Sequence, residues 1–118
     1  MKLIFVYNAD SGVANALLDS VHKVVSPSTY SCNLCNITYG VISEKKEWKE
    51  FRESSNIEMV FLHKDEFLKQ YRSKWLPKYE FPIILSKEKE GFEIYITSEV
   101  INKLEDSKAL IQELIKRL

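Results

Sequence analysis

Several features that would indicate particular functions are scarce or absent in this chain of 118 residues. Seventeen basic residues balance seventeen acidic ones, and a chain with no basic excess is not expected to bind nucleic acid. No apolar run approaches the roughly 20 residues that a membrane helix needs, so no membrane partner is expected. With only three glycines, the sequence cannot contain an overlooked glycine-rich nucleotide-binding loop.

No export signal is expected either, because Asn8 and Asp10 interrupt the apolar run that begins at Met1. The chain has only two cysteines, and without an export signal they are expected in a reducing cytosol. In that compartment a close cysteine pair is more often redox-active or metal-binding than a structural cross-link. We therefore predict a cytoplasmic protein whose distinctive chemistry belongs to Cys32 and Cys35.

Hydrophobic patterns predict strands alternating with helices, and the length allows one domain over residues 1–118. Apolar runs and alternating residues predict strands at Lys2–Tyr7, Ile57–Leu62, Phe81–Leu85 and Phe92–Thr97. Apolar residues at helical spacing predict helices over about 14–25, over Glu44–Ser54 after a Ser43 cap, over Asp65–Tyr71, and from Ser98 onward with a candidate break at Asp106-Ser107.

This order of elements predicts an α/β fold. The first two strands should be parallel, because a strand–helix–strand connection makes a right-handed crossover. The last two should form an antiparallel hairpin whose charged loop is Ser86–Gly91. We predict a three-layer sandwich, with a mixed four-stranded sheet between helices on both faces. An insert at about 26–56 would carry Cys32 and Cys35.

The element order and Pro82 resemble the thioredoxin fold. In that family a proline, usually with a cis peptide bond, precedes the first strand of the hairpin, and Phe81-Pro82-Ile83 places Pro82 there. Redox-active members carry Cys-x-x-Cys directly after the first strand, where this sequence has Asn8-Ala9-Asp10-Ser11 instead. The resemblance therefore implies a thioredoxin-like topology but not the usual place of the active site in the sequence. Parts of the chain also resemble small uncharacterised bacterial proteins, a likeness that implies no function.

The motif Cys32-Asn33-Leu34-Cys35 offers the strongest functional signal. Two thiols at this spacing can close a disulfide, and helical backbone after Cys32 would aim N–H groups at its sulfur and favour the thiolate. The leading hypothesis is a thiol–disulfide protein without a cofactor, in which Cys32 attacks and Cys35 resolves. Its partners would be proteins or small molecules that carry thiols or disulfides. The alternative is that both cysteines are small buried residues.

A zinc site is the other interpretation of the cysteine pair. Closed zinc sites have four ligands, and His22 and His63 are the only histidines that could join Cys32 and Cys35. The spacing of the histidines is not that of a zinc finger, so the fold would have to bring them together. The protein would then be a zinc-stabilised binding or structural module without catalytic activity.

The turn after the first strand gives a third hypothesis. Asn8, Asp10 and Ser11 follow the carboxyl end of that strand, where open α/β sheets bind ligands. Together with Pro82 they form a candidate ligand-binding set. The simpler interpretation is that Asp10 and Ser11 cap the next helix.

Overall fold

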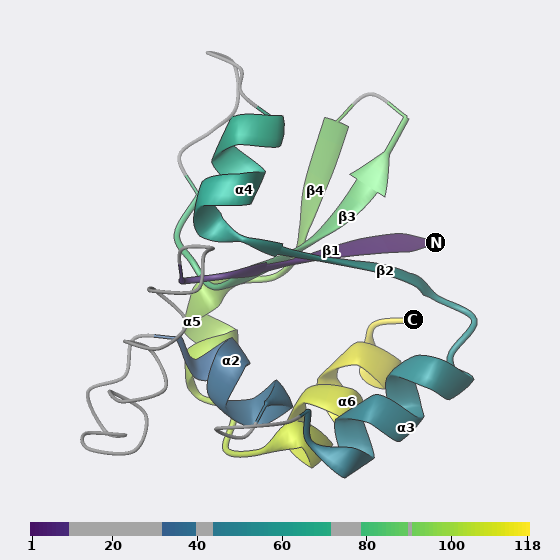
Figure 1. Cartoon of the computed structure of the whole chain (residues 1–118). Coiled ribbons are helices and arrows are strands. Elements are labelled where there is room, and N and C mark those ends of the chain that lie inside the picture. The colour runs from purple at the N-terminus through teal and green to yellow at the C-terminus, as the bar shows by residue number, and fades with distance from the viewer. Residues whose placement is uncertain (10–31, 40–43, 72–78, 90) are drawn as a thin grey trace.

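A mixed four-stranded sheet lies at the centre of this computed structural model (Figure 1), which describes residues 1–9, 32–39, 44–71, 79–89 and 91–118. Its strands are β1 (Lys2–Tyr7), β2 (Glu58–His63), β3 (Ile83–Glu88) and β4 (Gly91–Ile96), in the order β2-β1-β3-β4. β1 pairs parallel with β2 and antiparallel with β3, and β4 pairs antiparallel with β3. The predicted α/β class and the mixed four-stranded sheet are confirmed.

The central strand β1 explains the continuous apolar run at the start of the sequence. Leu3, Ile4, Phe5 and Val6 have no exposed surface, because both faces of the strand are covered. Successive side chains of a strand point to opposite faces. Leu3 and Phe5 accordingly belong to one buried cluster, and Ile4 and Val6 belong to another.

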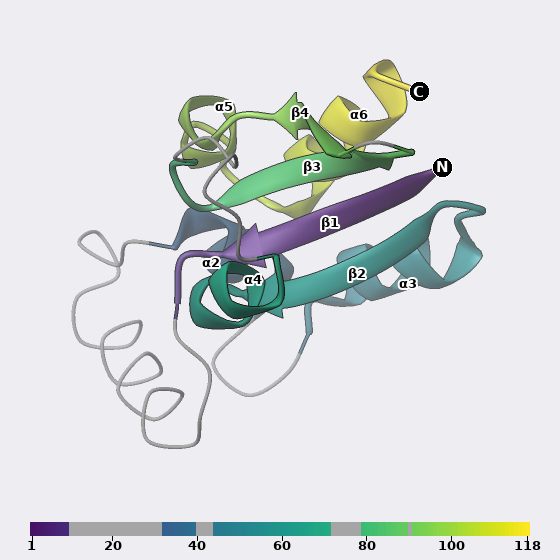
Figure 2. The same ribbon diagram turned by 90° about the horizontal axis from the view of Figure 1, so that it is seen from above.

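Helices lie on both sides of the sheet (Figures 1 and 2). One side carries α2 (Asn33–Thr38), α3 (Lys46–Ser54), α5 (Ser98–Asn102) and α6 (Ser107–Lys116). These helices pack on the Leu3 and Phe5 side through Leu34, Trp48, Ile101, Leu110 and Leu114. The opposite side carries α4 (Lys64–Gln70), whose Phe67 packs with Ile4 and Val6.

Several predicted boundaries shift by one or two residues. The cap of α3 is Lys45 and not Ser43, and α3 begins at Lys46 rather than at Glu44. The candidate break at Asp106-Ser107 is confirmed, because α5 ends at Asn102 and Asp106 caps α6 by accepting a hydrogen bond from the Ala109 N–H at 2.8 Å. The helix predicted over 14–25 lies outside the described residues.

The predicted hairpin loop Ser86–Gly91 is wrong. β3 continues through this charged segment to Glu88, which pairs with Gly91 at the start of β4. Lys87 and Glu88 are exposed, so their charges remain in water while their backbone pairs with β4. Charge therefore marks an exposed surface here and not the end of the strand. Gly91 has a φ of 140°, a conformation that favours glycine.

Candidate functional site

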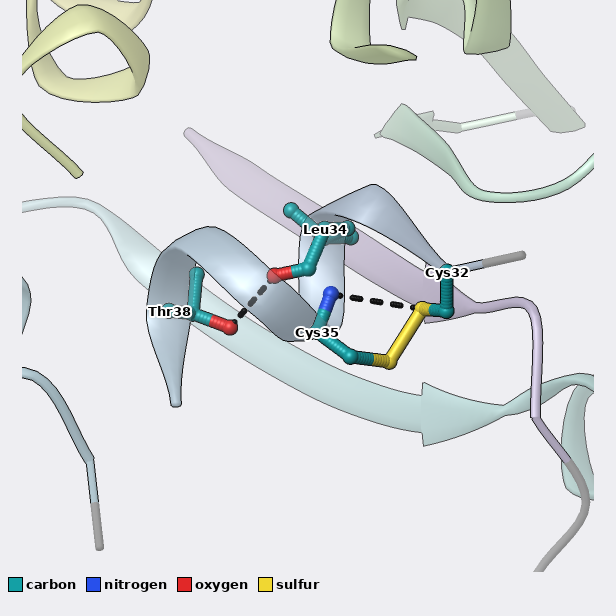
Figure 3. The surroundings of a disulfide bond; sticks show 4 residues. All are labelled: Cys32, Leu34, Cys35 and Thr38. Atoms are coloured by element: carbon teal, nitrogen blue, oxygen red, sulfur yellow. Dashed lines mark hydrogen bonds between the residues drawn. A yellow bond between two sulfur atoms is a disulfide. The ribbon is translucent and has the colours of Figure 1, made fainter. Parts of the chain in front are cut away.

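Cys32 and Cys35 are joined by a disulfide, with their Cα atoms 5.3 Å apart. Cys32 is the N-cap of α2, and the backbone N–H of Cys35 donates to the Cys32 Sγ at 3.2 Å (Figure 3). The Asn36 N–H donates to the Cys32 carbonyl oxygen at 3.1 Å, which closes the first turn of the helix. The N–H contact expected from helical backbone after Cys32 is therefore present.

Helix α2 lies in the least regular part of the sequence, where the residue pattern predicts no helix. With six residues it is too short to show an amphipathic period. The helix is fixed instead by contacts with segments far along the chain. The Asn33 Nδ2 donates to the carbonyl oxygens of Ile101 at 2.7 Å and Leu104 at 2.8 Å. The Ser107 Oγ donates to the Ile37 carbonyl oxygen at the other end of α2.

The fold places the disulfide at the carboxyl end of β1. Cys32 belongs to the same buried cluster as Tyr7, the last residue of β1, and Figure 3 shows the pair beside this end of the strand. The Phe81–Pro82 peptide bond is cis, and the following residue, Ile83, pairs with Val6 of β1. This pairing places Pro82 near the carboxyl end of β1, which is the end of the sheet where the disulfide lies.

The two cysteines differ in their exposure. Cys32 is only 1% exposed and is part of the buried cluster. Cys35 is partly exposed and packs against that cluster from outside. One sulfur-bearing residue is therefore enclosed by the core, while the other lies at its boundary.

His63 is engaged at the start of α4. It is the N-cap of that helix, and its backbone N–H donates to the Glu66 Oε1 at 2.8 Å. The His63 Nδ1 lies 2.7 Å from the same oxygen. Hydrogen bonds from the backbone and ring of His63 lower the pKa of Glu66. The two side chains form a capping box.

No group of three His, Cys, Asp or Glu residues that could hold a metal is present in the part of the chain that the structure describes. His22 lies outside that part, so the four-ligand zinc site stays a prediction. Within the described residues, no helix is long and apolar enough to cross a membrane.

The candidate ligand-binding set is described only in part. Asn8 follows β1 directly, and the carbonyl oxygen of the next residue, Ala9, accepts a hydrogen bond from the Lys64 N–H at 3.0 Å. This contact holds the segment after β1 against the start of α4. Asp10 and Ser11 lie outside the described residues, so binding at this turn also stays a prediction.

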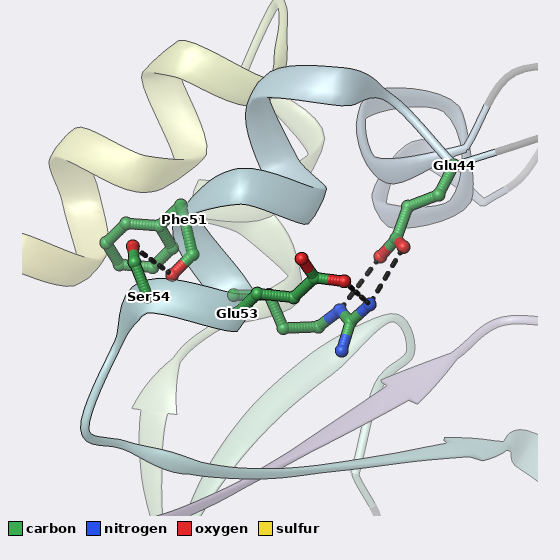
Figure 4. Close-up of polar contacts among 5 residues, drawn as sticks. Glu44, Phe51, Glu53 and Ser54 are labelled. Carbon is green, nitrogen blue, oxygen red and sulfur yellow. Dashed lines mark hydrogen bonds and ion pairs between the residues drawn. The ribbon is translucent and has the colours of Figure 1, made fainter.

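A polar and aromatic cluster beside the disulfide has no signal in the sequence. The rings of Tyr7 and Tyr39 lie 6.4 Å apart, and burial raises the pKa of both hydroxyls. Near them, the Glu44 carboxylate accepts two hydrogen bonds of 3.0 Å from the Arg52 guanidinium (Figure 4). Glu44 and Arg52 are eight positions apart in the sequence. Side chains that are neighbours on a helix are three or four positions apart, so the sequence does not predict this ion pair.

Comparison with known proteins gives no relative for this chain. No protein-family model matches it, and neither a curated protein nor a solved structure shows significant similarity.

Proposed function

We propose that this chain is a small thiol–disulfide redox protein in which Cys32 and Cys35 alternate between disulfide and dithiol. The observation that carries the proposal is the hydrogen bond from the Cys35 N–H to the Cys32 Sγ. A donor in this position stabilises negative charge on the sulfur when the disulfide opens, since a hydrogen bond to the charged form favours that form. The same hydrogen bond also caps the first turn of α2, so the helix start and the sulfur share one donor.

The arrangement of the sheet supports a thioredoxin-like topology for this protein. The strand order β2-β1-β3-β4, the cis bond before Pro82 and the helices on both faces agree with what the resemblance implies. In sequence, the cysteine pair is separated from β1 by residues 8–31. In space, Cys32 nevertheless starts a helix beside the carboxyl end of β1. The separation in sequence is therefore compatible with a site at the usual end of the sheet.

The proposed reaction requires no cofactor. One protein thiolate attacks a substrate disulfide, forming a mixed disulfide and releasing one substrate thiolate. The second protein thiolate then attacks the mixed disulfide, which releases the other substrate thiolate and forms the Cys32–Cys35 bond. Two electrons pass from the protein to the substrate. A cytoplasmic location would suit this reaction, because the thiol pools there can reduce the disulfide again.

Reduction of insulin by dithiothreitol tests the proposal. We expect the wild-type protein to accelerate precipitation of the insulin B chain, and the variants Cys32→Ser and Cys35→Ser to lose this acceleration. Asn36→Ala is a matched control on the same helix, because the Asn36 side chain makes no hydrogen bond to a described residue. A wild-type rate equal to that of dithiothreitol alone would contradict the proposal.

A non-catalytic binding or structural module is the second candidate function. The burial of Cys32 within the core favours it, because structural cysteines are typically enclosed and inert. Zinc would be held by Cys32, Cys35, His22 and His63 in the reduced protein. Metal analysis after purification without chelator separates the two functions. One equivalent of bound zinc supports the module, whereas metal-free protein with reversible thiols supports redox chemistry.

A further inference from the structure

The different exposure of the two cysteines bears on how a disulfide would exchange. Thiol–disulfide exchange begins when an external thiolate reaches one of the two sulfurs, so access decides which sulfur is attacked. Cys32 is 1% exposed and enclosed by the core, whereas Cys35 is partly exposed. Cys35 therefore offers an incoming thiolate exposed surface that Cys32 lacks.

The hydrogen bond at the disulfide favours the same direction of attack. When a thiolate attacks the Cys35 Sγ, the electron pair of the broken S–S bond passes to the Cys32 Sγ. That sulfur already accepts the Cys35 N–H at 3.2 Å, and a stabilised thiolate leaves faster. Attack at Cys32 would instead expel the Cys35 sulfur, which accepts no hydrogen bond from the described residues.

Contacts at both ends of α2 hold the two cysteines in these different positions. Asn33, next to Cys32, donates to the carbonyl oxygens of Ile101 and Leu104 in and after α5. Ser107 donates to the carbonyl oxygen of Ile37 at the far end of α2. A rotation of α2 that exposed Cys32 would break these hydrogen bonds, so Cys32 stays enclosed while Cys35 remains at the boundary.

We propose that substrates form their mixed disulfide with Cys35 and that Cys32 is the enclosed resolving thiolate. This inference rests on the proposed redox function and reverses the order expected from the motif. In the reductive direction, a thiolate RS⁻ attacks Cys35, an S–S bond forms between R and Cys35, and Cys32 leaves as thiolate. In the other direction, Cys35 attacks a disulfide RSSR, one RS⁻ leaves, and Cys32 then displaces the second.

Mapping of a glutathione adduct tests this order. The oxidised wild-type protein is mixed with excess reduced glutathione, quenched with acid within the first turnover, digested and analysed by tandem mass spectrometry. We expect glutathione attached to Cys35. Glutathione attached to Cys32 would overturn the inference while leaving the redox function intact. If neither cysteine takes up glutathione and no free protein thiol appears, the inference and the proposed function both fail.

Single-cysteine variants provide the second measurement. With oxidised glutathione, Cys32→Ser should form its adduct at Cys35 roughly tenfold or more faster than Cys35→Ser forms one at Cys32, because access limits the reaction of an enclosed thiol. Two controls accompany this measurement. In denaturant both variants should react at equal rates, and in its absence both should have the circular dichroism of the wild type. Together these results show that the difference arises from the folded structure. A faster reaction at Cys32 in the folded protein would contradict the proposed order.

Discussion

The two sides of the sheet hold their helices in different ways. On one side, α2 packs through buried Leu34 and is in addition held by hydrogen bonds to backbone carbonyl groups of distant segments, with Asn33 and Ser107 as side-chain donors. On the other side, α4 is attached by aromatic packing around Phe67, whose ring centroid lies 5.4 to 6.0 Å from those of Tyr71, Tyr79, Phe81 and Phe92. Polar contacts with defined geometry fix position and orientation, whereas apolar packing mainly contributes stability.

This difference agrees with the role proposed for each side. The helix that carries the disulfide needs a fixed orientation, because exchange depends on which sulfur faces the solvent. Helix α4 carries no proposed reactive group, and burial of one large side chain is sufficient to hold it. Substitutions on the two sides should therefore affect stability and reactivity in different proportions.

The largest effect on stability is expected from Phe67→Ala. Phe67 is fully buried, and removal of a buried phenylalanine ring costs about 3–5 kcal/mol of unfolding free energy. Denaturant unfolding measures this loss, with Leu68→Ala as the control, because Leu68 on the same helix is 50% exposed. Where the variant remains folded, its rate of glutathione exchange should equal that of the wild type. A loss below that of the control would contradict the packing described for α4.

Reduction of the disulfide should have the next largest effect. The cross-link closes a very short loop, for which the chain-entropy relation gives about 2 kcal/mol of stabilisation. Unfolding in the presence and absence of a phosphine reductant measures this difference. The far-ultraviolet circular dichroism of the reduced protein should still show the sheet, because the strands pair independently of the cysteines. Complete unfolding on reduction would indicate a structural cross-link instead.

Asn33→Ala should lower stability by an amount comparable to reduction of the disulfide, and it should have a specific effect on reactivity. The variant loses two hydrogen bonds to carbonyl oxygens, each worth about 0.5–1.5 kcal/mol net. Because α2 is then held less firmly, we expect Cys32 to react faster with alkylating reagents after reduction. Asn36→Ala should change neither quantity. Unchanged alkylation of Cys32 in Asn33→Ala would show that this side chain does not keep the cysteine enclosed.

Glu66→Gln should have the smallest effect and should depend on pH. The His63 contacts lower the pKa of Glu66 in the folded protein, so the ionised carboxylate stabilises the fold above its ordinary pKa of 4.5. Both side chains are nearly half exposed, and the loss at neutral pH should remain below about 1 kcal/mol. As the pH falls through the folded pKa, the wild type should lose this advantage. A difference that persists at a pH low enough to protonate the Glu66 carboxylate would contradict the capping box as its cause.

The sequence predicts one side of this comparison better than the other. Phe67, Leu68 and Tyr71 repeat at helical spacing, and this local signal locates α4 to within one residue at each end. The neighbouring sequence gives no sign that the Asn33 side chain donates hydrogen bonds to the carbonyl oxygens of residues 101 and 104, because these partners are about 70 positions away. The mixed sheet follows from the order of apolar runs, but the position of the cysteine pair depends on contacts between distant segments.

The exposure of the cysteines is likewise beyond prediction from the motif. The Cys-x-x-Cys motif places two thiols close enough in sequence to pair, but it does not determine which of them faces the core. That depends on how α2 packs against α5 and α6, and hence on Asn33 and Ser107. The sequence therefore identifies the two cysteines of the candidate site. Which of them is exposed can be known only from the folded structure.

Equilibration of the Cys32–Cys35 pair with defined ratios of reduced and oxidised glutathione tests the central claim most directly. A reactive pair should convert reversibly between disulfide and dithiol, in one two-electron transition, at a potential between about −270 and −120 mV, the range of known oxidoreductases. A disulfide that resists reduction down to potentials below about −300 mV would be a structural cross-link, and the proposed redox function would be wrong.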